Sequence, residues 1–139
     1  METNEEESSG SHWQREPLFT KAELEKIYKF NDEGREQIKG KMRGAVAILG
    51  KHATARFRGE QSEVDPEHLD TAMHDYQVAL YTAHLMHQFG GEALLHDDGV
   101  LADKFQRLGD EIHKAGIDSF TEAAPDVVAH YKSRQSELE

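Results

Sequence analysis

The chain has 139 residues, the usual size of one domain, and its 27 acidic and 16 basic residues give it a net charge of -11. It contains no cysteine, which excludes disulfides, thiolate metal sites and cysteine nucleophiles. It also lacks the run of about 20 apolar residues that a membrane-spanning helix needs, and its acidic start is unlike a signal peptide. We therefore expect a cytoplasmic protein with neither nucleic acid nor a membrane as its partner.

The first residues are predicted to form a tail. Residues 1–16 are acidic and contain serine and glycine, and Trp13 is the one large apolar side chain after Met1. Such a composition cannot bury enough apolar surface to fold, so we expect a disordered acidic tail. Residues 17–139 are expected to form a single helical domain.

The first helix is predicted from its cap. Thr20 and Glu23 have the spacing of a capping box, in which each side chain bonds the backbone of the other residue. Phe19, just before the cap, can pack against Leu24 in the first turns. The predicted helix covers residues 21–30.

A second helix is predicted from apolar residues at helical spacing. Asn31 or Asp32 offers its cap, and Gly59 is the expected stop. The stripe consists of Ile38, Met42, Ala45 and Leu49. Gly40 and Gly44 weaken this helix unless a neighbouring element packs closely against them.

The third helix has the clearest start and is expected to be the longest. Asp65 is a good N-cap, and Pro66 stands at the first helical position, where its missing N–H has no cost. Apolar residues then recur in steps of three and four up to Phe89, and Gly90 and Gly91 are the expected stop.

A fourth helix and a closing region complete the fold. The turn at residues 97–99 precedes a stripe that runs to Gly116, and residues 119–124 and 125–133 are predicted to form one or two closing helices. Signals for strands or hairpins are absent. We therefore predict an all-α, compact five- or six-helix domain, globin-like or bundle-like, with an acidic N-terminal tail.

Charge is distributed unevenly along the chain. Seven basic residues accompany a single acid, Glu36, between positions 35 and 58: Arg35, Lys39, Lys41, Arg43, Lys51, Arg56 and Arg58. Six acids without a base follow: Glu60, Glu63, Asp65, Glu67, Asp70 and Asp75. Two interpretations are open: attraction between adjacent helices along a solvated face, or an exposed basic patch for an anionic partner.

The nine histidines raise the question of a metal site. His84 and His87 share a helical face, and Glu92 and His96 are four residues apart, but the zinc motif H-E-x-x-H and the paired E-x-x-H of di-iron bundles are missing. No G-x-S-x-G nucleophile elbow or glycine-rich nucleotide loop is present either. We predict no catalytic residue, no metal ligand and no cofactor, and we lean against an enzyme.

The third helix is rich in aromatic residues and histidines that cover more than one face. They fit either a helix packed on two sides or a cleft with ring walls and a few polar contacts. The predicted ligand contacts, with one residue from the fourth helix, are His74, Tyr76, Tyr81, His84, Phe89 and Phe105.

Four short motifs resemble those of antibiotic-binding domains of the TipAS type, the C-terminal sensor domains of MerR-type regulators. They are Thr20-Lys21 with Glu23, Gly59-Glu60 followed by Asp65 and His74, Asp103-Lys104-Phe105, and Gly116-Ile117 with Phe120 and Glu122-Ala123. The similarity covers residues 20–131. The chain differs at Ala115, where the family has proline, and near Gly99, where it has tyrosine, and its stretch before Gly59 is longer and more basic.

The resemblance implies a stand-alone, globin-like domain that closes around an apolar, polycyclic or peptidic small molecule, often an antibiotic. The first hypothesis is therefore non-enzymatic binding of such a molecule. The alternative is an acidic protein-interaction module, an inhibitor or adaptor, that binds a basic protein partner and is anchored by Trp13. The third is histidine-based metal or haem binding.

Overall fold

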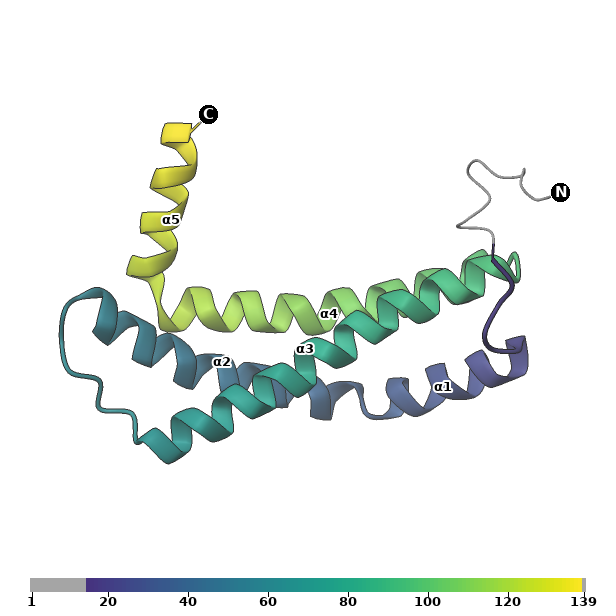
Figure 1. Ribbon diagram of the computed structural model, residues 1–139, viewed down its shortest axis with the longest axis horizontal. Helices are drawn as coiled ribbons and strands as arrows, with labels where there is room; N and C mark the ends of the chain where they lie inside the picture. The colour runs from purple at the N-terminus through teal and green to yellow at the C-terminus, as the bar shows by residue number, and fades with distance from the viewer. Residues whose placement is uncertain (1–14, 139) are drawn as a thin grey trace, which may run out of the picture.

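The computed structural model describes residues 15–138 and confirms the all-α class (Figure 1). The described chain forms five helices: α1 (Lys21–Glu33), α2 (Arg35–Phe57), α3 (Pro66–Leu95), α4 (Gly99–Ala123) and α5 (Pro125–Leu138). As expected, α3 is the longest, with 30 residues.

The helices form a bundle of three rods with one projecting helix. α1 and α2 follow one another along one side, α3 runs back across them, and α4 returns beside α3 (Figure 1). The most extensive contacts join α2, α3 and α4. α5 turns away from the end of α4, and only its first turns contact the bundle.

Two predicted caps are confirmed. The Glu23 amide donates to the Thr20 hydroxyl at 3.1 Å, and the Thr20 amide donates to the Glu23 carboxylate at 2.7 Å. The Asp65 carboxylate accepts from the Glu67 amide at 2.8 Å, directly before the first turn of α3.

The predicted cap of the second helix at Asn31 or Asp32 is wrong. Both residues lie inside α1, where the side-chain amide of Asn31 donates to the Ile27 carbonyl at 2.8 Å. The break falls instead at Gly34, which ends α1 and precedes α2. The Asn31 side chain bonds back to the preceding turn instead of capping a new helix, and α1 continues for three residues beyond the expected end.

Two helices also extend beyond the glycines at which their predicted stripes end. α3 continues through Gly90 to Leu95, and α4 continues through Gly116 to Ala123. A Cβ at Gly90 would lie 3.2 Å from the Ala102 carbonyl oxygen, and one at Gly116 would lie 2.9 Å from the Met42 sulfur. These glycines therefore allow close helix crossings, and the contacts they permit outweigh their low helix propensity.

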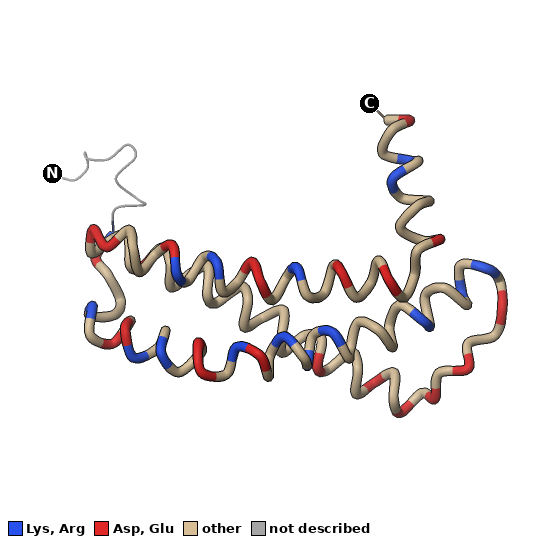
Figure 2. The backbone as a smooth tube through the Cα atoms, turned by 180° about the vertical axis from the view of Figure 1, so that it is seen from behind, with Lys and Arg blue, Asp and Glu red and all other residues tan. Residues whose placement is uncertain are grey.

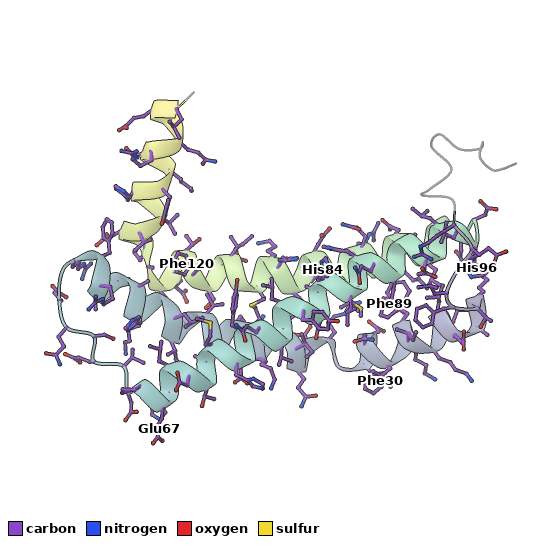
Figure 3. All side chains as sticks on the ribbon, viewed as in Figure 1. Phe30, Glu67, His84, Phe89, His96 and Phe120 are labelled. Atoms are coloured by element: carbon purple, nitrogen blue, oxygen red, sulfur yellow. The ribbon has the colours of Figure 1, made fainter. Side chains whose placement is uncertain are left out.

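The bundle has two buried clusters, one toward each end. At one end, α1 lies over α3 and α4, and we call this the covered end. Its cluster contains Leu24, Met86, Ala93, Leu101, Ala102, Phe105 and Leu108. At the other end, α2 packs against α3 and α4, and we call this the groove end after the groove described below. Its cluster contains Met42, Val46, Ala79, Ala83, Ile112 and Ala115. Figure 3 labels Phe89 and His96 toward the covered end and Phe120 toward the groove end.

Part of the basic stretch on α2 pairs with acids of other helices. Arg35 bonds Glu111 of α4 at 2.6 Å, and Lys39 lies 3.4 Å from the same carboxylate. The predicted attraction between α2 and the acidic start of α3 is present as one ion pair, Lys41 to Asp75 at 3.6 Å. Arg58 forms a further ion pair with Asp126 of α5 at 2.6 Å. The shortest ion pairs of the basic stretch therefore join α2 to α4 and to α5.

Candidate functional site

An apolar groove opens where α2, α3, α4 and α5 meet. Its volume is about 600 Å³. All four helices line it, with Met42, Val46, Leu49, Tyr76, Leu80, His113, Gly116, Ile117, Phe120, Thr121, Val128 and Lys132. Most of these side chains are aliphatic or aromatic, so the groove offers a surface for the burial of an apolar body.

Small residues beneath the groove let its three long helices approach one another. Ala79 and Ala83 of α3 are fully buried, and Ala115 of α4 lies beside them. Gly116 leaves room for the side chain of Met42, which is itself buried. The groove therefore has a packed floor, on which Tyr76, Leu80 and Phe120 form half-buried walls.

The turn between α4 and α5 builds the fourth side. α4 ends at Ala123, and Ala124 leaves the helical conformation with φ -136° and ψ 56°. Pro125 then begins α5 in a new direction. Because of this turn, Val128 and Lys132 line the groove instead of extending the line of α4.

Three contacts brace α2 against the end of α4. The Ser119 hydroxyl donates to the Arg43 carbonyl at 2.8 Å, and the Thr54 hydroxyl lies 3.1 Å from the Ala123 carbonyl. A Cβ at Gly50 would lie 2.7 Å from the Ala123 Cβ, so the two helices touch there through backbone and one methyl group. These contacts fix the spacing of two groove walls.

A few polar groups lie among the apolar ones. They are the Tyr76 phenol, the His113 imidazole, the Thr121 hydroxyl and the Lys132 amine. The Thr121 hydroxyl already donates to the Ile117 carbonyl at 2.8 Å. Phenol, imidazole and amine groups suit the polar or anionic edge of a mainly apolar molecule.

His113 is held in place by a neighbouring histidine. The rings of His87 and His113 stack with centroids 5.6 Å apart, and His87 Nε2 lies 3.0 Å from a carboxylate oxygen of Asp110. Gly109 makes room for this arrangement, because a Cβ there would lie 2.5 Å from His87 Nε2. The stack links α3 to α4 beside the groove.

The six predicted contact residues fall in three places. Tyr76 lines the groove. His74, Tyr81 and His84 lie exposed on the outer side of α3. Phe89 and Phe105 meet at the covered end with ring centroids 5.7 Å apart, and Phe105 is fully buried. The structure therefore does not bring the six together.

The other groove residues were not predicted as contacts. Met42 and Leu49 belong to the predicted stripe of the second helix, and Phe120 and Val128 lie in the predicted closing helices, which were expected to help form the cleft. Phe120 is also part of a motif of the TipAS resemblance. The periodicity of these residues is the same for a groove wall as for a core residue, so it could not distinguish the two.

The histidines considered as metal ligands have other surroundings. His87 pairs with Asp110, and His96 Nε2 lies 2.7 Å from the Phe19 carbonyl oxygen. Glu92 bonds Arg15 and the Leu18 amide. Over residues 15–138, no three or more histidine or carboxylate side chains gather as ligands for a metal ion.

At the covered end, the segment before α1 is tied to the end of α3. Glu92 is 3% exposed, and its carboxylate accepts bonds from Arg15 and, at 2.7 Å, from the Leu18 amide. Burial acts to raise the pKa of Glu92, but the bonds from Arg15 and from the Leu18 and Phe19 amides outweigh it and hold the pKa below its ordinary value. Arg15, assigned to the tail by composition, therefore packs against the domain.

Trp13, the expected anchor for a basic protein partner, lies outside the described residues, as do positions 1–14 generally. None of the helices described is both long enough and apolar enough to cross a membrane. Searches for a matching family, a similar curated protein or a similar solved structure found none.

Proposed function

We propose that this protein binds an apolar or peptidic small molecule, without chemical conversion, in the groove between α2, α3, α4 and α5. The groove itself carries this proposal: it is an apolar surface, open to solvent, with a volume of about 600 Å³. Sites for small molecules commonly occupy roughly 300–1,000 Å³ and combine apolar walls with a few polar groups.

The composition of the lining supports a ligand with one polar edge. Leu80, Ile117 and Val128 offer aliphatic contacts, and Phe120 offers a ring face. Lys132 adds a positive charge, and no carboxylate is among the described residues that line the groove. A neutral or weakly acidic apolar molecule therefore fits the groove better than a cation does.

The resemblance to TipAS-type domains points to the same class of ligand. One of its four motifs, Gly116-Ile117 with Phe120 and Glu122-Ala123, falls on the part of α4 that lines or borders the groove. An antibiotic-like, polycyclic or peptidic molecule is thus the first class of ligand to test.

A fluorescent probe allows a direct test. We expect 1-anilinonaphthalene-8-sulfonate, an apolar dye with one negative charge, to bind the folded protein and to be displaced by antibiotic-like ligands. Ile117 is 64% exposed at the groove, so Ile117→Asp should leave the fold intact. It should weaken dye binding at least about tenfold, because an apolar contact is replaced by a charge that repels the sulfonate.

Leu94→Asp provides the matched control. Leu94 is 59% exposed and lies near the end of α3, far from the groove. Dye affinity should therefore stay at the wild-type value in this variant. Equal weakening in both variants, or a wild-type protein that binds neither the dye nor any member of the ligand panel, would overturn the proposal.

A further inference from the structure

The middle of α3 is unlike the rest of the protein surface because it lacks charge. Charged residues make up 31% of the chain, but none lies between Asp75 and Glu92. At about 1.5 Å per residue, this uncharged stretch covers roughly 24 Å of helix. In the tube view, charged residues mark the length of α4, whereas the middle of α3 has none (Figure 2).

Burial does not explain this absence. One side of the stretch faces solvent, and its exposed residues recur at helical spacing: Gln77, Tyr81, His84 and Gln88. We call these four residues the neutral face. Tyr81 is 63% exposed, and Val78, one turn before it, is 38% exposed. Their positions would accommodate charged side chains as easily as any other exposed helix surface.

The outer side of α4 shows what such a surface usually carries. At the same spacing it presents Asp103, Arg107, Asp110, Lys114 and Asp118, all exposed. Two of the ion pairs on this side, Arg107 to Asp103 and Lys114 to Asp118, stay within α4. Depletion of charge around an exposed tyrosine is typical of an interface centre, and α3 has this composition where α4 does not.

We propose that the neutral face is the surface through which two copies of this chain associate, with their α3 helices antiparallel and Tyr81 near the two-fold axis. Two copies that each carry a charge of -11 repel one another, and the repulsion is smallest where charged side chains are absent. The neutral face is such a surface, so it favours a like-charged copy over a basic partner.

The chemistry of the neutral face also makes it self-complementary. Amide, phenol and neutral imidazole groups can each donate and accept a hydrogen bond, so identical faces can pair with themselves. Tyr81 lies at the middle of α3, which spans Pro66–Leu95. In an antiparallel pair, Gln77 of one copy then lies opposite residues near His84 of the other.

This inference is independent of the proposed function. Tyr76 and Leu80 of α3 line the groove, whereas the neutral face lies on another side of the same helix. Association through α3 therefore leaves the groove open.

Sedimentation equilibrium of the full chain over a wide concentration range tests the inference. We expect the mass of two chains for the wild type and at least about 100-fold weaker association for Tyr81→Glu, because the two carboxylates would meet near the axis. Tyr131→Glu is the matched control, because Tyr131 is 68% exposed on α5. It should associate like the wild type.

Mixing variants tests the two-fold arrangement itself. Tyr81→Glu and Tyr81→Lys should each stay monomeric alone but associate when mixed. Circular dichroism verifies that each variant is folded, and Gln88→Glu replaces Tyr81→Glu if that variant unfolds. A wild type that is monomeric at every concentration, a Tyr81→Glu dimer, dissociation by Tyr131→Glu, or failure of the mixture to associate would each overturn the inference.

Discussion

The two ends of the bundle use the same pair of helices, α3 and α4, with opposite results. At the covered end, α1 and the segment before it lie over these helices, and Phe105 is fully buried. At the groove end, α2 takes the place of α1, α5 turns away, and Phe120 stays half-buried. The difference shows that the elements packed over α3 and α4 decide whether these two helices enclose a core or leave a groove open.

Truncation of one phenylalanine at each end is the strongest test of this difference. Phe105 contacts the rings of Tyr28 and Phe89, with centroids 5.3 Å and 5.7 Å away. We expect Phe105→Ala to lower the free energy of unfolding by about 3–5 kcal/mol. Phe120→Ala should lower it by only about 1–2 kcal/mol, because that side chain is only partly buried.

Urea denaturation of both variants measures the two losses. If Phe120→Ala were as destabilising as Phe105→Ala, the groove end would be a closed core, and the small-molecule site would lose its basis. If both losses were small, the covered end would be open as well.

The buried carboxylate of Glu92 gives an intermediate effect that depends on pH. Glu92→Gln removes the charge that Arg15 pairs with while keeping an acceptor for the Leu18 amide. We expect a loss of about 1–2 kcal/mol at neutral pH, in the range of a hydrogen bond to a charged group. The contact between the segment before α1 and the end of α3 should become less stable, and the groove end should be unaffected.

The pH dependence follows from the lowered pKa of Glu92. Its ionised form is favoured by folding, so the stabilisation is complete above the unfolded-state pKa of about 4.3 and is lost as the pH falls through the lower folded-state value. The stability of the wild type and of Glu92→Gln should therefore converge in acid. A difference that stays constant down to low pH would show that the charge of Glu92 does not stabilise the fold.

Much of the fold could be predicted because its signals are local. The capping box at Thr20 and the Asp65-Pro66 start specify helix beginnings through backbone hydrogen bonds within a few residues. Helix ends were less predictable because glycine has two uses. Gly90 and Gly116 are helical because another helix fills the space a side chain would occupy, and that contact is invisible in one sequence.

The site was harder to predict for a related reason. Tyr76 was assigned to a cleft and does line the groove, but Tyr81 and Phe89 on the same helix lie elsewhere. Helical periodicity tells which residues share a face, but it does not tell which face a neighbour covers. The contribution of Val128 depended on the turn at Ala124, a tertiary feature without a motif of its own.

The smallest expected effects come from two glycines of α2, and they test whether the groove end is rigid. A Cβ at Gly50 would lie 2.7 Å from the Ala123 Cβ, whereas Gly44 has no atom within 4 Å of that position. Gly44→Ala should stabilise the protein by about 0.5–1 kcal/mol through helix propensity alone. Gly50→Ala gains the same propensity but forces α2 and α4 apart, so we expect a net loss of about 1 kcal/mol. If urea denaturation showed equal stabilisation by both, the wall between α2 and α4 would be pliable, and the groove would take its shape from its ligand.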